Sequence, residues 1–217
     1  DLIDALNKQL LNIDMLELII IDDASSNKSI KYLENIQFKN KQIITLDNQS
    51  GRCVVRNKGI KLANGEYCLF TNSNTIPQSN FLQKYIESLS ASNINGFAGI
   101  INYDSEDISF EKYLNHGKRG LKKYHPNEVL PIGDVLFGNC AIKTSLLKSS
   151  GGFNEKLNGY GGEEIDLLYR INYEYNLEII KINATVLRHH HPDFDEHCKR
   201  LIEFGSKNFR LLPFKVQ

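Results

Sequence analysis

The sequence lacks several features that would assign its class directly. Its 26 basic and 26 acidic residues cancel, so no overall positive charge favours a nucleic-acid partner. Its four cysteines include no C-x-x-C pair, which predicts reduced thiols in a cytoplasmic protein rather than a disulfide framework. No signal peptide is visible, and no apolar run approaches the roughly 18 residues of a spanning helix. These absences predict a protein without a transmembrane segment and leave peripheral membrane association open.

The chain also lacks internal repeats and low-complexity linkers, and its 217 residues are enough to bury a core as one domain. Apolar runs of strand length alternate with helical patterns, which predicts an α/β fold with a largely parallel sheet. The predicted strands are residues 16–21, 42–46, 67–70, 96–103, 134–137 and 178–188. The predicted helices are residues 2–11, 27–38, 51–63, 79–90, 143–149 and 193–211, together with one that begins near Glu163.

Residues 104–132 interrupt this alternation, because they are polar and irregular in pattern. A second irregularity lies at the start, where the chain opens on a helical pattern although an open α/β domain usually opens on a strand. We therefore expect the first strand to lie upstream of Asp1.

Residues 159–170 (GYGGEEIDLLYR) carry the most specific chemistry in the chain. Glycines allow a close approach of backbone to a ligand, and here they precede Glu163 and Glu164, with Asp166 just behind. The start of a helix stabilises negative charge. This pattern predicts a general base at the mouth of a pocket.

Two predicted strands end in polar loops, where α/β proteins bind their ligands. Asp22 and Asp23 follow the first strand, and they have two interpretations: contact with a nucleotide base or ribose, or capping of the helix near Asn27. Asn72 and Asn74 follow a later strand and are either ligand contacts or a polar turn. Amides are poor ligands for a hard divalent cation, which prefers carboxylates.

Basic residues occur at two further places. Arg52 and Arg56 follow Gly51 at the start of a predicted helix, where they indicate either a phosphate site or a solvated stripe. The run of His189, His190 and His191 ends the last predicted strand, and imidazole binds metal or phosphate. Strand alternation predicts that the first and third histidines share one face.

Six motifs in order make the chain resemble the family 2 glycosyltransferases, which are nucleotide-sugar-dependent enzymes of fold type A. They are residues 17–25 (ELIIIDDAS), 51–57 (GRCVVRN), 64–67 (NGEY), 72–74 (NSN), 151–155 (GGFNE) and 161–166 (GGEEID). The resemblance covers nearly the whole chain. It implies a Rossmann-like sheet in a single domain, with a nucleotide-sugar-binding half at residues 1–103 and an acceptor-binding, base-carrying half at residues 104–217.

The resemblance also implies roles for the donor side of the site. Asp23, with Asp22 beside it, is similar to the acid that holds uracil or another base. Arg56 and Asn57 match the loop that packs around the nucleotide. Residues 72–74 stand in the place of the Asp-x-Asp motif, which binds the ribose and a divalent metal, Mn²⁺ or Mg²⁺.

Further roles follow around the transferred sugar. Gly161 and Gly162 resemble the loop beneath the donor sugar, and Asn139 resembles part of the acceptor-side wall. His189 is similar to a late histidine that contacts metal or diphosphate, with His191 next. The predicted metal ligands are therefore Asn74 and these two histidines.

Two departures from the family pattern bear on activity. Glu164 stands where the family carries an aspartate base, which lengthens the acid by one methylene. Asn72 and Asn74 remove two negative charges from the metal site. Three explanations remain open: a variant inactivated by design, a natural non-catalytic domain, or an enzyme that offsets charge with Arg52, Arg56 or histidine.

We interpret the chain as an inverting glycosyltransferase that moves a sugar from a nucleoside diphosphate sugar, expected to be a UDP-sugar, to an acceptor hydroxyl, with Glu164 as base. The expected acceptor is a carbohydrate or glycoconjugate, and the resemblance points to surface-polysaccharide biosynthesis. The alternative is an inactive domain of the same fold that binds nucleotide or serves as a scaffold. A flavodoxin-like binder is a more remote alternative.

Overall fold

The computed structural model describes residues 2–10, 15–25, 33, 35–91 and 93–213. The strands are β1 (Leu18–Asp22), β2 (Lys41–Thr45), β3 (Tyr67–Thr71), β4 (Thr75–Pro77), β5 (Gly96–Tyr103), β6 (Asn139–Lys143) and β7 (Ile179–Arg188). The helices are α1 (Leu2–Leu10), α3 (Arg52–Leu62), α4 (Phe81–Ala91), α5 (Ile108–Leu114), α6 (Thr144–Ser149), α7 (Glu163–Tyr175) and α8 (Phe194–Ser206). The 3-10 turns are η1 (Gly120–Lys123), η2 (Ile132–Asp134) and η3 (Asn208–Leu211).

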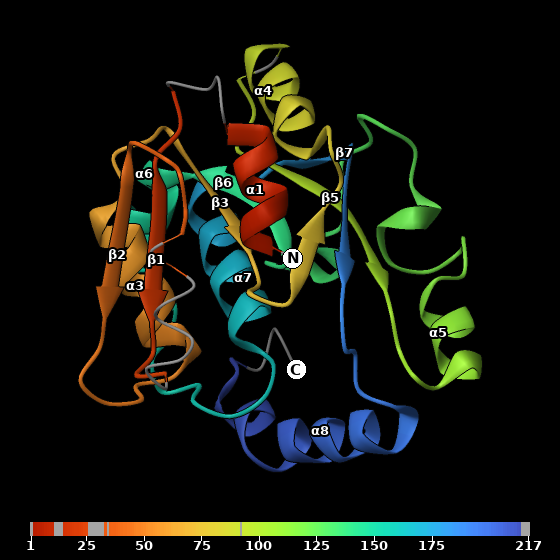
Figure 1. Cartoon of the computed structure of the whole chain (residues 1–217). Coiled ribbons are helices and arrows are strands. Elements are labelled where there is room, and N and C mark those ends of the chain that lie inside the picture. The colour runs from red at the N-terminus through yellow and green to blue at the C-terminus, as the bar shows by residue number, and fades with distance from the viewer. Residues whose placement is uncertain (1, 11–14, 26–32, 34, 92, 214–217) are drawn as a thin grey trace.

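The described strands form a five-stranded sheet in the order β3-β6-β5-β7-β4 and a separate pair, β1-β2 (Figure 1). β1 pairs with β2 in parallel, and β5 pairs with β7 in parallel. β6 runs antiparallel to both of its neighbours, and β4 runs antiparallel to β7. The predicted α/β fold is therefore confirmed, while the five-stranded sheet is mixed rather than largely parallel.

The direction of β6 explains this difference. The chain leaves β5, passes through α5, η1 and η2, and re-enters the sheet between β3 and β5 in the opposite direction. A strand buried on both faces has the same continuous apolar pattern whichever way it runs. Hydrophobic patterning therefore indicates the strand but not its direction.

Neighbouring residues of the central strands point to opposite faces and build two cores. On one face Ala98 and Cys140 pack in a cluster that includes Leu167 and Leu168 of α7. On the other face Phe97 and Ala141 pack in a cluster that includes Phe81 and Tyr85 of α4 and Leu6 of α1. The sheet is thus covered on both sides, and α7 is fixed against it by its apolar stripe.

One predicted strand is wrong. Residues 132–134 form η2, and the strand of this region begins only at Asn139. The side chains of Val135 and Phe137 are nevertheless buried in the core. Their apolar pattern therefore records burial of a loop rather than a strand.

Other boundaries differ in smaller ways. Within the segment expected to be irregular, α5 forms with Asp107 as N-cap, its side chain accepting from the Phe110 amide. The closing helix ends at Ser206 and is followed by η3. Of the predicted helix 27–38, residues 27–32 and 34 lie outside the described part, and residues 36–38 are not helical. Within the described ranges, no helix is long and apolar enough to cross a membrane.

Candidate active site

The site begins where β1 ends, at Asp22 and Asp23. Asp23 accepts hydrogen bonds from the amides of Ser50 (2.7 Å) and Gly51 (3.0 Å), the two residues before α3. Gly51 has φ +87°, a conformation that favours glycine. Asp22 is buried and accepts from the Ser25 amide at 3.1 Å. Both carboxylates therefore order the loops at this strand end, and the helix start that they were expected to cap lies outside the described residues.

Two arginines of α3 bind the two glutamates that begin α7. Arg52 Nη1 lies 2.5 Å from Glu163 Oε1, and Arg56 Nη1 lies 3.1 Å from Glu164 Oε1. The paired residues are 111 and 108 positions apart in the sequence. These ion pairs join the two halves of the chain, and they engage the arginines that were expected to bind phosphate or form a solvated stripe.

The two glutamates differ in their surroundings. Glu163 is 3 % exposed, and its Oε2 is buried with no hydrogen-bond partner in the described part of the chain. The Glu164 side chain is 19 % exposed, and its Oε2 accepts from the Phe137 amide at 3.1 Å. Arg56, which holds the other oxygen, lies over the Phe137 ring at 5.7 Å. Glu164 is therefore fixed at both oxygens yet accessible, as a general base has to be.

Asp166 lies within a buried network of α7. It is buried, and its Oδ2 accepts from Arg170 Nε at 3.0 Å. Arg170 in turn donates to the carbonyl oxygens of Ser150 and Gly152. This buried network anchors α7 to the loop after α6, so Asp166 stabilises the site without facing it.

Asn57 is likewise a structural residue in this structure. Its side chain accepts from the Phe153 amide (2.7 Å) and donates to the Phe153 carbonyl (2.9 Å) and to Glu155 (2.8 Å). A Cβ atom at Gly152 would lie 2.4 Å from Asn57 Oδ1, so only glycine fits there. The expected nucleotide contact of Asn57 is thus replaced by a contact that shapes the 151–155 loop.

The asparagine slot lies between β3 and β4. The Asn72 carbonyl accepts from the Thr75 amide and hydroxyl, and its side-chain nitrogen lies 2.8 Å from where a Cβ of Gly138 would be. Asn74 exchanges hydrogen bonds with His189, since its carbonyl accepts from the His189 amide and its Nδ2 donates to the His189 carbonyl. The slot therefore lies against both β7 and the segment that leads to β6.

The three histidines follow the end of β7 and differ in their surroundings. His189 Nδ1 lies 2.6 Å from Asp104 Oδ2. His190 has φ +52°, so the strand alternation on which the predicted shared face depends does not continue through the run. His191 is 8 % exposed, its ring lies 4.8 Å from the Tyr103 ring, and neither ring nitrogen has a hydrogen-bond partner among the described residues. Burial, aided by nearby positive charge, lowers the pKa of His191 to about 4.

These contacts test the predicted metal site. Asn74 donates to the His189 carbonyl, the His189 ring binds Asp104, and His191 lies among aromatic rings. Within the described ranges, no three histidine, cysteine or acidic side chains gather to hold an ion. A hard divalent cation needs several oxygen ligands with negative charge. The predicted ligands therefore do not fit such a site.

The glycine loop before α7 is held by the C-terminal segment. Gly161 and Gly162 have φ values of +76° and +90°. Asn208 Nδ2 donates to the Gly161 carbonyl at 2.7 Å, and a Cβ at Gly162 would lie 2.9 Å from the Phe204 ring. The tight packing fixes the direction in which α7 presents its glutamates.

Asn139 does not line a wall of the site. It is 0 % exposed, donates to the carbonyls of Ile100 and Ala184, and accepts from the Tyr85 hydroxyl. The side chain replaces missing backbone hydrogen bonds where the β5–β7 register shifts near Gly99. The expected ligand contact is therefore corrected to a buried role in the sheet, because all its polar atoms have partners in the protein.

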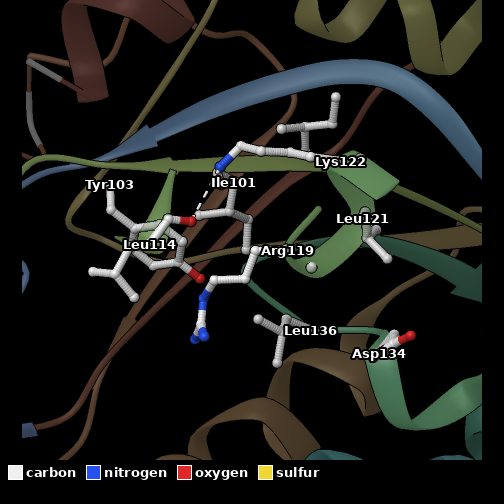
Figure 2. Close-up of a pocket in the computed structure, with 11 residues that line it drawn as sticks. Ile101, Tyr103, Leu114, Arg119, Leu121, Lys122, Asp134 and Leu136 are labelled. Carbon is white, nitrogen blue, oxygen red and sulfur yellow. Dashed lines mark hydrogen bonds between the residues drawn. The ribbon is translucent and has the colours of Figure 1, made fainter. Parts of the chain in front are cut away.

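A cavity of about 110 Å³ opens beside these residues (Figure 2). It is lined by Gly99, Ile100, Ile101, Tyr103, Leu114, Arg119, Gly120, Leu121, Lys122, Asp134 and Leu136. Lys122 Nζ donates to the carbonyls of Ile101 and Leu114 and so supports the wall. Leu136 of the lining is followed in the chain by Phe137, whose amide donates to Glu164, while Glu164 itself is not a lining residue. Sequence reasoning missed this cavity, although the basic run at residues 118–123 (KRGLKK) was a signal.

A chain of contacts joins the predicted residues. Asp23 holds the start of α3, whose arginines bind Glu163 and Glu164. Asn72 lies against Gly138. The residue before Gly138 is Phe137, whose amide donates to Glu164. These contacts link the first strand end, the asparagine slot and the start of α7, and the roles of their residues in binding stay predictions.

Comparisons with known proteins agree with this arrangement. A family model described as Glycosyl transferase family 2 matches residues 1–150. Dolichyl N-acetyl-alpha-D-glucosaminyl phosphate 3-beta-D-2,3-diacetamido-2,3-dideoxy-beta-D-glucuronosyltransferase of Methanococcus voltae is 26% identical over 178 residues, or 76% of this chain and 52% of that protein. Poly(ribitol-phosphate) beta-glucosyltransferase of Bacillus spizizenii is 30% identical over 162 residues, or 68% of this chain and 23% of that protein. The chain thus spans about half, or less, of the length of these relatives.

Solved structures give the same fold. S. aureus TarS 1-349 in complex with UDP-GlcNAc superposes with a TM-score of 0.68 at 17% identity, covering 88% of this chain and 54% of that chain. GalNAc-T7 with UDP, GalNAc and Mn2+ superposes with a TM-score of 0.64 at 14% identity, covering 88% and 41%. At such identities the likeness shows the fold alone, which is fold type A as predicted.

Proposed function

The chain belongs to glycosyl transferase family 2, and from this membership we propose that it transfers a sugar from a nucleoside diphosphate sugar to an acceptor hydroxyl. The observation that carries the proposal is the position of Glu164. It lies in the first turn of α7, one oxygen is held by Arg56 and the other by the Phe137 amide, and the side chain remains partly exposed. A carboxylate fixed in this way can accept a proton in a defined direction.

In the proposed reaction the acceptor oxygen attacks the anomeric carbon of the donor from the side opposite the diphosphate. The bond from that carbon to the diphosphate oxygen breaks, and its electron pair leaves with the diphosphate. Glu164 takes the proton of the acceptor hydroxyl. A single displacement of this kind inverts the anomeric configuration. Glu163 and Asp166, both buried and paired with arginines, position the base rather than act in the reaction.

We propose a uridine nucleotide as the donor, supported by the UDP and UDP-GlcNAc in the related structures. Residues 1–103 would supply the nucleotide side through Asp22, Asp23 and the asparagine slot, and residues 104–217 the acceptor side. Gly161 and Gly162 would support the donor sugar. A divalent cation is expected from the family, but the described residues do not fit it, so no step here depends on one. The four free cysteines support a cytoplasmic location.

The proposed acceptor is a carbohydrate or glycoconjugate, as the names of the relatives suggest. The alternative is a domain that binds nucleotide without turnover. Asn72 and Asn74 favour that alternative, because they remove the charge that usually binds the metal.

Two measurements separate these functions. Calorimetry tests UDP binding, and hydrolysis of a panel of UDP-sugars tests turnover, with Glu164→Gln compared against Glu174→Gln, an exposed glutamate further along α7. Binding with turnover that only Glu164→Gln abolishes supports the enzyme. Binding without turnover supports the alternative, and no binding of UDP contradicts both.

A further inference from the structure

Two arginines near Tyr103 differ from the others around the site. Arg52, Arg56 and Arg170 each form an ion pair with an acid of α7. Arg119 and Arg188 form no ion pair within the described ranges, and Arg119 lies instead over the Tyr113 ring at 4.1 Å. A partly buried guanidinium without a carboxylate is costly, which suggests that a ligand supplies the missing charge.

Arg188 has a further unsatisfied group. Its Nε is buried and has no hydrogen-bond partner within the described part of the chain. The residue ends β7, where it aligns with Tyr103 of β5 on one side and with Thr75 of β4 on the other. Thr75 directly follows the asparagine slot, so Arg188 lies at the strand end next to Asn74.

The two arginines and the candidate base act on the same tyrosine hydroxyl. Burial raises the pKa of the Tyr103 hydroxyl, the positive charges of Arg188 and Arg119 oppose that rise, and Tyr160 and Glu164 add to it. The charges of both arginines and of Glu164 thus all influence the pKa of the Tyr103 hydroxyl. Tyr103 and Arg119 line the same cavity, as Figure 2 shows.

The asparagine slot supplies the reason for such cations. The departing diphosphate carries negative charge that a glycosyl transfer must stabilise. Asn72 and Asn74 provide no carboxylate to hold a divalent cation, and Arg52 and Arg56 are engaged by the glutamates of α7. Arg188, next to the slot, and Arg119, in the cavity lining, have no acidic partner in the described structure. Lys122 of the same lining also lacks one, but its ammonium donates to two carbonyl oxygens and to Asn115.

We propose that Arg119 and Arg188 bind the diphosphate of the donor in place of a divalent metal ion. The inference rests on the proposed function. Guanidinium groups bind phosphate oxygens through paired hydrogen bonds and keep their charge at any physiological pH. When the bond from the anomeric carbon to the diphosphate oxygen breaks, the electron pair stays on that oxygen and the arginines donate to it. Donor binding and transfer are then independent of metal.

The test is calorimetry with UDP in buffer that contains EDTA. We expect UDP to bind the unmodified chain, and Arg119→Gln and Arg188→Gln each to weaken binding about tenfold or more, the range of a charge-assisted hydrogen bond. Lys118→Gln removes an exposed charge next to Arg119 and is expected to leave the affinity unchanged. Arg188→Lys, which keeps the charge, should restore part of the loss.

UMP provides the control for a merely structural effect. The variants should reduce the advantage of UDP over UMP, whereas a general distortion of the site would weaken both nucleotides equally and contradict the inference. Binding of UDP only with Mn²⁺ would overturn the inference and leave the proposed function intact. Metal-free binding that neither variant weakens would overturn it as well, and no binding in either buffer would overturn both. Thermal unfolding shows whether each variant folds. If Arg188→Gln does not fold, the binding measurements on Arg119→Gln provide the test.

Discussion

The start of α7 and the ends of β5 and β7 use the same kinds of charged residue in opposite ways. On α7, Glu163, Glu164 and Asp166 each have an arginine within 3.1 Å. Around the strand ends, Arg188, the last residue of β7, and Arg119, the residue before η1, have no such acid in the described structure. Among the described residues, His191 has no hydrogen-bond partner at either ring nitrogen. In the first region each acid has an arginine partner. In the second region, the Arg188 Nε has no hydrogen-bond acceptor among the described residues.

This difference separates structure from binding. A buried carboxylate paired with an arginine fixes the helix that carries it, and removal of one partner leaves a buried charge. Unpaired cations at the end of a sheet are available to an anionic ligand. Glu164 belongs to both groups, because it is paired and still partly exposed.

The largest effect is expected at Glu164. Glu164→Gln keeps the size of the side chain and can still accept from the Phe137 amide, but it cannot take a proton from the acceptor. We expect the rate of sugar transfer to fall about 10³-fold and the affinity for UDP to change little. Steady-state kinetics with Glu174→Gln as control measure the change. A variant that keeps most of the activity would show that Glu164 is not the base.

Removal of a structural acid should act on stability instead. Asp166→Asn breaks the buried pair with Arg170, and we expect the free energy of unfolding to fall by about 3 kcal/mol. Glu196→Gln, in an exposed pair with Arg200, should cost less than about 1 kcal/mol. Urea denaturation compares the two variants. Equal losses would contradict the distinction between the buried and the exposed pair.

The unpartnered histidine should make stability depend on pH. Since the pKa of His191 is lowered from 6.5 to about 4 in the folded state, the unfolded chain binds more protons between these values. The stability is complete above about pH 6.5 and is lost as the pH falls towards 4, by roughly 1–2 kcal/mol at pH 5. His191→Phe should flatten this slope in thermal unfolding at pH 7 and pH 5. His197, whose pKa is also lowered by burial, would account for the remainder.

The smallest effect is expected at the asparagine slot, in the affinity for UDP. Asn74→Asp places a carboxylate beside the strand ends, where it should repel the diphosphate and weaken UDP binding about tenfold without metal. Mn²⁺ should restore part of the affinity. Asn74→Ser loses the bond to the His189 carbonyl without adding charge, and it serves as control. Equal losses in both variants, with no response to Mn²⁺, would contradict an electrostatic cause.

Much of the fold followed from the sequence. The bounds of β5 match the predicted strand 96–103, and α3 and α7 form where their apolar patterns indicated. The six motifs also indicated the family, whereas the roles that they imply for Asp23, the asparagine slot and Glu164 stay predictions. Local patterns suffice here because burial of one face fixes the period of a helix or strand.

Other features depended on residues far apart in the chain. The antiparallel entry of β6, the burial of Asn139 at a register shift, and the positive φ of His190 leave no local pattern. The cavity around Tyr103 also depends on several segments that meet only in the folded chain.

The sequence by itself determined where most of the helices and strands lie and which family the motifs resemble. Only the tertiary structure decided which charges have partners, because an ion pair such as Arg56–Glu164 joins residues 108 positions apart. The hydrophobic period of a helix or strand depends on residues that are close in the sequence. Whether two charged side chains pair depends on their distance in the folded protein. The distinction between a structural acid, a base and an arginine left for a ligand therefore arises only on folding.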